Sequence, residues 1–170
     1  AHPADEPGQE LIRHVYQCSL DHRFLGKIHF IEDYNMMTGR MLVQGTDLWL
    51  NNPRRPMEAS GTSGMKTAMN GVPNLSILDG WWDEGYKQNN GWAIGNDEYQ
   101  ENDHSQDHFD ANSLYELLEN DIVEKFYNRN GDNTPDEWIK VMRSSIEHSL
   151  FQFSTYRMLS EYQSTMYYGN

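Results

Sequence analysis

The chain has 170 residues, of which 37% are hydrophobic, and a formal net charge of −13. At this length the upper limit is one domain that buries roughly 70% of its unfolded surface. Its single cysteine, Cys18, excludes an intrachain disulfide, and no apolar run approaches the eighteen or so residues that a membrane span needs.

The amino-terminal half is predicted to alternate helices and strands. Apolar residues from 11 to 16 follow a helical stripe, and residues 27–32 alternate as in a strand. The further elements expected are a helix over 35–44, a strand over 46–50, a helix over 61–71 and a strand over 74–78. This alternation predicts an α/β fold in which helices cover a parallel sheet.

The connection after the second predicted strand is expected to reach the ligand-binding edge of the sheet. Pro53 and Pro56 keep it extended and non-helical. Open α/β sheets bind ligands outside the carboxyl ends of their strands. Residues 51–60 should therefore deliver Glu58 and the following turn to that edge.

The turn before the 61–71 helix has the composition of an anion site. Gly61 and Gly64 allow close approach to the backbone, Thr62 and Ser63 add hydroxyl donors, and Lys66 stands in the first turns of the helix. By spacing alone, a tight turn with a solvated lysine remains the alternative.

The carboxyl-terminal half is predicted to be helical. Residues 88–124 hold ten acidic residues and no lysine or arginine, which indicates that this one segment is a solvated loop and helix face. No nucleic-acid or membrane partner is expected for the chain. We expect a polar loop up to Asp110, then helices over 112–128, 135–151 and 154–167. The acidic and histidine side chains between His104 and Asp110 could suggest a metal site, but a solvated loop is the preferred interpretation and no metal is assigned.

Several motifs closely resemble those of the α-glucan phosphorylases. Residues 58–66, Glu-Ala-Ser-Gly-Thr-Ser-Gly-Met-Lys, with Asn70-Gly71 and Leu78-Asp79-Gly80 after them, resemble the pyridoxal-phosphate segment of that family. Residues 27–35 are similar to the strand that enters its cofactor site, and 153–162 to its carboxyl-terminal helix. Residues 81–84 and 90–95 resemble the bacterial and archaeal branch.

The resemblance implies a fold and a domain organisation. It implies a Rossmann-like parallel sheet, part of the carboxyl-terminal domain of a GT-B glycosyltransferase fold, with carboxyl-terminal helices. Residues 1–95 would form a partial domain that binds pyridoxal phosphate, and 96–170 an acidic loop and helices packing on it. The amino-terminal part of the same enzyme would be missing, the complete enzyme could be a homodimer, and the location would be cytoplasmic, since no signal peptide is visible.

The resemblance also implies a reaction, the transfer of a terminal α-1,4-linked glucose from glucan to inorganic phosphate. Lys66 matches the lysine that holds pyridoxal 5'-phosphate as a Schiff base, and it is expected to be catalytic together with Thr62. The other matches are Thr62, Ser63, Gly64 and Tyr34 for the cofactor, and Glu58, Ser60 and Gly61 for the glucosyl unit. The 170 residues alone are expected to be inactive.

Two other functions remain as alternatives. A nucleotide-sugar-dependent retaining glycosyltransferase would have two glutamates eight residues apart, but here the position eight after Glu58 is Lys66. A module that binds cofactor or a partner without catalysis is the second alternative.

Some side chains have two interpretations. Arg54 and Arg55 either contact sugar or phosphate or pair with acidic residues of 88–124. Tyr34 could be an ordinary core aromatic residue. Trp81, Trp82 and Trp92 either stack on glucan or contribute apolar packing between domains.

Overall fold

The computed structural model describes residues 2–96 and 98–168. By their contacts the residues divide into two compact units, Ala1–Gly39 and Arg40–Asn170. Helix α2 (Met36–Gly45) begins in the first unit and ends in the second. No helix in the described part of the chain is long and apolar enough to cross a membrane.

The first unit contains helix α1 (Glu6–Leu20), which Asp5 caps by accepting a hydrogen bond from the Gly8 amide at 3.0 Å. The strand predicted over 27–32 is absent, and the prediction was wrong. Phe30 and Ile31 are 44% and 45% exposed. A strand needs a hydrogen-bonded neighbour, and residues 2–39 contain no other strand to pair with.

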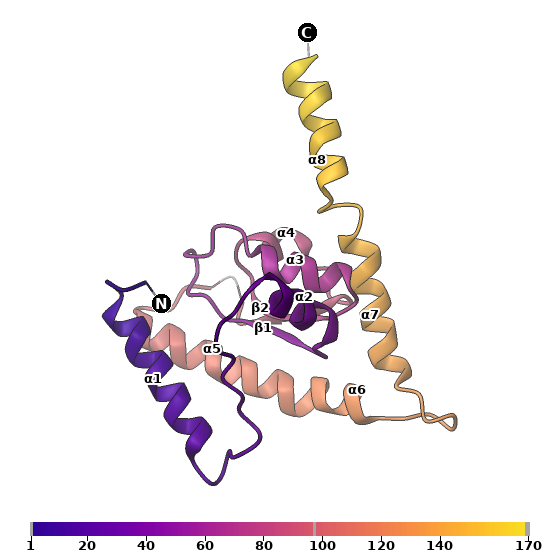
Figure 1. Cartoon of the computed structure of the whole chain (residues 1–170). Coiled ribbons are helices and arrows are strands. Elements are labelled where there is room, and N and C mark those ends of the chain that lie inside the picture. The colour runs from indigo at the N-terminus through magenta and orange to yellow at the C-terminus, as the bar shows by residue number, and fades with distance from the viewer. Residues whose placement is uncertain (1, 97, 169–170) are drawn as a thin grey trace. The chain divides into compact units, whose positions relative to one another are not determined.

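The second unit is built on a parallel sheet of three strands (Figure 1). Strands β1 (Trp49–Asn51), β2 (Asn74–Ile77) and β3 (Gly91–Ile94) lie in that order, with Trp49 opposite Asn74 and Asn74 opposite Gly91. The predicted parallel α/β arrangement is confirmed. Strand β1 is shorter than the strand predicted over 46–50 and begins later, at Trp49. Strand β3 was not predicted.

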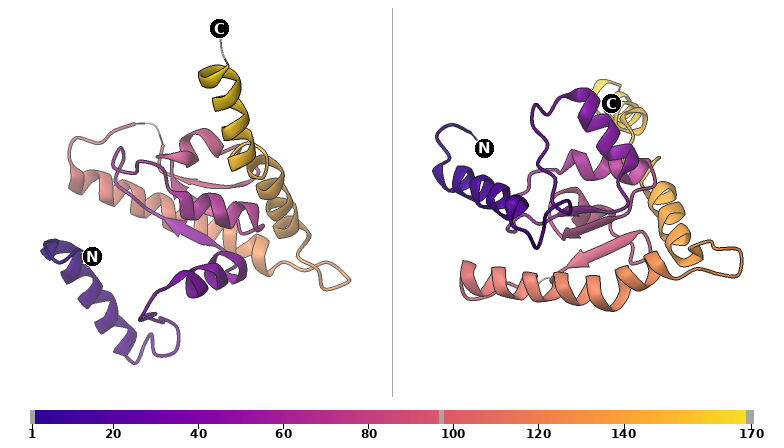
Figure 2. Two further views of the ribbon diagram at one scale, coloured as in Figure 1. Left: turned by 45° about the horizontal axis from the view of Figure 1, so that its top comes forward. Right: turned by 60° about the horizontal axis from the view of Figure 1, so that its bottom comes forward.

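One face of the sheet is covered by a long helical segment (Figure 2). It comprises α5 (Asp103–Leu117), a π-helical turn η1 (Leu118–Ile122) and α6 (Val123–Tyr127). Leu75 and Ile77 of β2 pack there with Trp92 and Ile94 of β3. All four residues of β2 are buried, as expected for a parallel strand with both faces covered.

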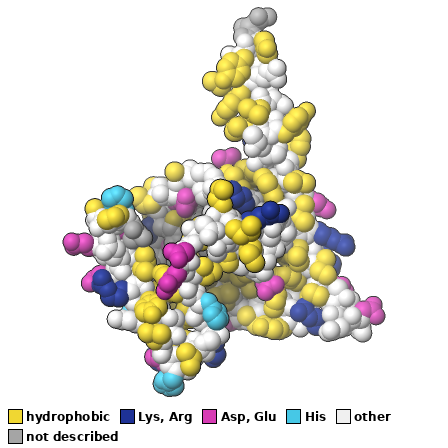
Figure 3. Space-filling model, in the orientation of Figure 1, with side chains coloured by type: hydrophobic (Ala, Val, Ile, Leu, Met, Phe, Trp, Pro, Cys, Tyr) yellow, Lys and Arg dark blue, Asp and Glu magenta, His cyan; other side chains and the backbone are white. Residues whose placement is uncertain are grey.

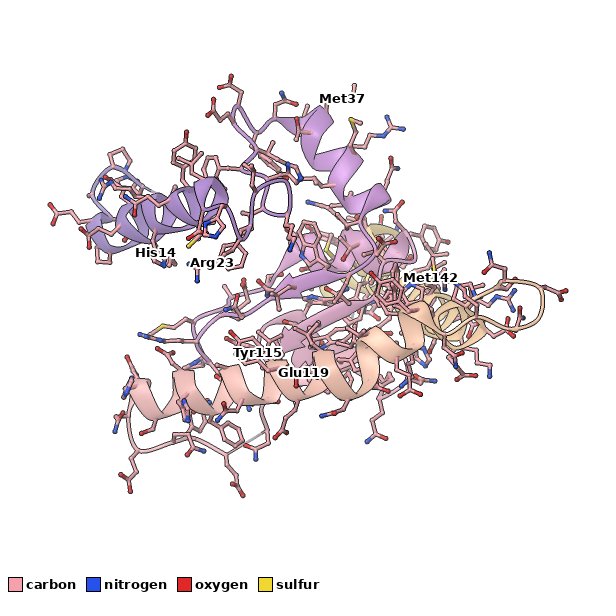
Figure 4. All side chains as sticks on the ribbon, turned by 90° about the horizontal axis from the view of Figure 1, so that it is seen from below. His14, Arg23, Met37, Tyr115, Glu119 and Met142 are labelled. Carbon is pink, nitrogen blue, oxygen red and sulfur yellow. The ribbon has the colours of Figure 1, made fainter. Side chains whose placement is uncertain are left out.

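The long segment corrects the predicted polar loop. Its helix begins at Asp103, so the stretch up to Asp110 is helical. Asn102 starts the helix by accepting a hydrogen bond from the Ser105 amide at 3.0 Å. Tyr115 and Glu119 of this segment, which Figure 4 labels, are exposed.

The other face of the sheet carries α3 (Thr62–Met69) and the short helix α4 (Trp81–Gly85). Trp81 and Trp82 pack there against Ala68, and Trp82 Nε1 donates to the Trp92 carbonyl at 3.1 Å. Helix α7 (Asp136–Ser149) contacts both α3 and α6, so it connects the two helical layers.

Helix α8 (Thr155–Tyr162) continues into a second π-helical turn, η2 (Gln163–Tyr167). The helices predicted over 35–44, 61–71, 135–151 and 154–167 are therefore confirmed with small shifts. Hydrophobic side chains lie exposed along α8 (Figure 3). The domain boundary expected at residue 95 stays a prediction.

Candidate functional site

The loops after β1 and β2 meet at the carboxyl edge of the sheet. The Glu58 amide donates a hydrogen bond to Oδ2 of Asp79 at 2.8 Å, and the Trp81 amide donates to the Ser60 carbonyl at 2.7 Å. Asp79 is 8% exposed, and its Oδ1 also accepts from the Gly80 amide at 2.9 Å. These bonds fix the backbone of residues 58–60 at the edge where α/β sheets bind ligands.

Two glycines allow the loops to approach so closely. Gly80 has φ +55°, and a Cβ there would lie 2.6 Å from the Ser60 carbonyl oxygen. Gly61 has φ +84°, and its Cβ would lie 3.0 Å from Trp81 Cδ1. Both conformations are in the left-handed region that favours glycine, so the turn predicted from composition is a requirement of the backbone.

Helix α3 has one buried and one exposed face. Gly64, Thr67 and Ala68 are buried, while Thr62, Ser63 and Lys66 are exposed. Thr62 and Lys66 are four residues apart, so their side chains lie on the same side of the helix. The turn therefore presents hydroxyl groups and one primary amine together.

The buried face of α3 is tied to β2. Asn74 Nδ2 donates to the Gly64 carbonyl and to Thr67 Oγ1, both at 3.2 Å. A Cβ on Gly64 would lie 2.6 Å from both Asn74 Oδ1 and Trp81 Nε1, so only glycine fits at this point. Asn74 and its role in orienting α3 were not predicted, although a buried asparagine at the start of an apolar strand is a usable signal.

The residues present fit a ligand with a phosphate group and a carbonyl carbon. Gly61 precedes α3, and no side chain caps the helix, so the first amide groups of α3 can donate to an anion. Thr62 and Ser63 add hydroxyl donors. Lys66 supplies the primary amine that can condense with an aldehyde.

Seven of the eight predicted site residues lie in one segment of the second unit. Glu58, Ser60, Gly61, Thr62, Ser63, Gly64 and Lys66 belong to one continuous turn and helix. Tyr34 lies in the unit Ala1–Gly39 and its side chain is 66% exposed, so its interpretation as a core aromatic residue was wrong. Its expected place near the cofactor stays a prediction.

The two arginines before Glu58 have acidic partners. Arg54 contacts Asp103 and Asp107 of α5, so the expected pairing with the acidic segment is confirmed for Arg54. Arg55 lies 3.6 Å from Asp83 of α4 and over the ring of Tyr99. The hydrogen bonds from Arg54 hold the pKa of the Asp107 carboxyl below its usual value.

Other candidates are structural. Trp81, Trp82 and Trp92 are buried in apolar clusters inside the second unit. This contradicts stacking on an exposed glucan and corrects the expected packing between domains to packing within one unit. Among residues 2–96 and 98–168, no three His, Cys, Asp or Glu side chains gather in a way that could hold a metal ion.

The chain is similar to known proteins over almost its whole length. A model of the family described as carbohydrate phosphorylase matches residues 20–168. The chain is 47% identical to the maltodextrin phosphorylase of Thermococcus litoralis, over 98% of its own length and 20% of that protein. It is 43% identical to the glycogen phosphorylase of Aquifex aeolicus, over 98% of its own length and 24% of that protein. It is 40% identical to the glycogen phosphorylase of Mycobacterium tuberculosis, over 98% of its own length and 19% of that protein.

The chain thus spans about a fifth to a quarter of the length of these relatives. No solved structure matches it significantly.

Proposed function

This chain belongs to the carbohydrate phosphorylase family, and from that premise we propose that it is the later part of the cofactor domain of an α-glucan phosphorylase with the GT-B fold. The complete enzyme transfers a terminal α-1,4-linked glucosyl unit from glucan to inorganic phosphate and releases glucose 1-phosphate with retention of configuration. The names of its relatives, which refer to maltodextrin and glycogen, support a glucan as the substrate.

One observation carries the proposal. Lys66, Thr62 and Ser63 are exposed together on α3, whose first turn has no side-chain cap, directly after Glu58. A phosphate-bearing aldehyde cofactor, pyridoxal 5'-phosphate, needs this combination of amide groups, hydroxyls and a primary amine. Arginine could not replace Lys66, because its guanidinium does not condense with the aldehyde.

In this proposal the protein orients the reacting groups. When bound, pyridoxal 5'-phosphate would supply a phosphate group for proton exchange with the substrate phosphate. Lys66 would anchor the cofactor through its amine, while Thr62, Ser63 and the Gly64 turn would hold its phosphate. Tyr34 is proposed as a further cofactor residue from the resemblance alone.

The glucosyl unit is held by the residues just before α3. The amides of Ser60 and Gly61 donate to it, and the Glu58 carboxylate accepts from one of its hydroxyl groups. Because the backbone of Glu58 is held by Asp79, this carboxylate is oriented before the substrate arrives.

A phosphorolysis assay tests the proposal on the complete enzyme. We expect glucose 1-phosphate from maltodextrin and phosphate, no transfer from a nucleotide sugar, and loss of activity in Lys66→Arg, which keeps the charge but not the reactive amine. Transfer from a nucleotide sugar without phosphorolysis, or full activity of Lys66→Arg, would contradict it.

The 170 residues alone are predicted to be inactive, because they span about a fifth of a maltodextrin phosphorylase and the partner they need is the amino-terminal part of the same enzyme. Turnover of maltodextrin and phosphate by the purified chain would contradict this prediction. The homodimer and the cytoplasmic location stay predictions.

A further inference from the structure

The loop that precedes Glu58 is tied to a distant helix by a forked ion pair. Arg54 Nε donates to Oδ1 of Asp107 at 2.8 Å, and Nη2 donates to Oδ2 at 2.5 Å. Nη1 donates to Oδ2 of Asp103 at 3.1 Å. Two parallel hydrogen bonds to one carboxylate fix the direction as well as the distance of the guanidinium, which a lysine could not do.

The charges of α5 explain why an arginine is required there. Asp103 and Asp107 are four residues apart on the helix, where like charges repel each other. The segment 88–124 contains no lysine or arginine of its own. Arg54, which comes from the loop after β1, therefore supplies the positive charge that these two carboxylates share.

Arg54 with Asp103 and Asp107 forms what we call the clamp. Arg54 lies four residues before Glu58, and the backbone between these two residues is held at both ends. The Arg54 carbonyl accepts a hydrogen bond from the Met57 amide at 2.8 Å. The next amide, that of Glu58, donates to Asp79 at 2.8 Å. A shift of Arg54 would therefore move the turn that leads directly into Glu58.

We propose that Arg54, held by Asp103 and Asp107, is a positioning residue that fixes the loop 52–60 and through it the Glu58 carboxylate. The acidic helix α5 thus has a function in the site although none of its side chains is expected to touch the substrate. The kinetic consequence rests on the proposed function, in which Glu58 binds the glucosyl unit.

Hydrogen exchange of the 170-residue chain tests the clamp without any activity. In Arg54→Ala and in Asp107→Asn we expect the amides of residues 51–60 to exchange about fivefold faster, at the upper end of what an exposed ion pair of good geometry contributes. In Arg54→Lys the exchange rate of these amides should lie between the rates in these variants and the rate in the parent chain. Arg143→Ala is the matched control, because Arg143 is exposed and has no recorded ion pair or hydrogen bond of its guanidinium among the described residues.

The result for Asp107→Asn is decisive, because this residue lies on a different element from the loop. Unchanged exchange of residues 51–60 in this variant would overturn the proposal, as would an equal acceleration in Arg143→Ala. A double variant Arg54→Ala/Asp107→Asn should be no faster than the faster single variant, since both remove the same interaction.

Kinetics of the complete enzyme provide the second readout. We expect Arg54→Ala to raise KM for maltodextrin about fivefold and to leave kcat within about twofold, because a misplaced Glu58 weakens ground state and transition state alike. Partial recovery of KM in Arg54→Lys distinguishes positioning from general loss of structure. A fall in kcat alone, with KM and exchange unchanged, would overturn the proposal. If the parent enzyme shows no phosphorolysis, the proposed function fails, while hydrogen exchange still decides whether the clamp exists.

Discussion

Replacing Gly64 by alanine adds one methyl group where α3 meets the sheet. Its Cβ would lie 2.6 Å from both Asn74 Oδ1 and Trp81 Nε1, whereas ordinary contacts begin near 3.4 Å. Asn74 is fully buried and Trp81 is 4% exposed, so neither side chain can turn away. Helix α3 must therefore shift away from β2, which weakens the two hydrogen bonds donated by Asn74.

The two contributions to the change can be compared. Overpacking of a buried contact costs up to about 3 kcal/mol, and alanine recovers about 1 kcal/mol as the better helix former. We expect a net loss of about 2 kcal/mol in the free energy of unfolding, or a fall of about 4–8 °C in Tm for a chain of this size.

Urea unfolding of the 170-residue chain, followed by circular dichroism, measures this loss. Gly45→Ala is the matched control, because Gly45 also lies in a helix, at the end of α2, and has no heavy atom within 4 Å of its added Cβ. The control should be unchanged or slightly more stable. If Gly64→Ala is as stable as Gly45→Ala, the inference that α3 packs closely against Asn74 is contradicted.

Asp79→Asn should lower the free energy of unfolding by about 2 kcal/mol, because one of the two amides that donate to Asp79, those of Glu58 and Gly80, loses a charged acceptor. The control Asp132→Asn, on an exposed turn, should change this free energy by no more than about 0.5 kcal/mol. Equal effects of the two substitutions in urea unfolding would contradict this expectation. Ser154→Ala should cost about 1 kcal/mol of helix stability and reduce the helical circular dichroism signal, because α8 loses its amino-terminal cap. The control Ser160→Ala, inside the same helix, should leave the signal unchanged. A larger loss of signal in Ser160→Ala than in Ser154→Ala would refute the cap. The pKa of Asp107 is lowered in the folded chain, so its stabilisation is present above the ordinary pKa near 4 and is lost as the pH falls through the lower folded value. The stability difference between the parent and Asp107→Asn should therefore shrink from pH 5 to pH 2, and a constant difference would contradict the assignment.

The site turn and the elements around it were predictable from local chemistry. Gly61 and Gly64 lie where the backbone or the packing excludes a side chain, and the short segment after Gly71, with Leu75 and Ile77, forms the expected strand. These signals depend on a few neighbouring residues. The α3 to β2 segment could for that reason be derived with nearly correct bounds.

Elements that depend on distant partners were not predictable in the same way. Residues 27–32 alternate like a strand but have no neighbouring strand in their own unit, and alternation cannot report this. Strand β3 has only four residues between Gly91 and Ile94, and its neighbours Asn90 and Gly95 are typical of turns.

The start of α5 was missed for another reason. Residues 103–110 are almost entirely polar and show no apolar stripe, so periodicity indicates a loop. The usable signal was Asn102, a residue type favoured at the amino-terminal cap, whose side chain accepts from the Ser105 amide. The ion pairs from Arg54 to Asp103 and Asp107 join residues about fifty positions apart. The sequence alone therefore could not decide whether this arginine contacts a ligand or pairs with the acidic segment 88–124.

Reductive trapping at Lys66 is the most direct test of the central claim. The complete enzyme, supplied with pyridoxal 5'-phosphate, is treated with borohydride and digested, and the peptides are analysed by mass spectrometry. We expect the pyridoxyl phosphate mass on Lys66, with Lys87 unlabelled in the same digest and no label on any peptide of Lys66→Arg. A label on another lysine, or none on Lys66, would contradict the assignment of this turn as the cofactor site.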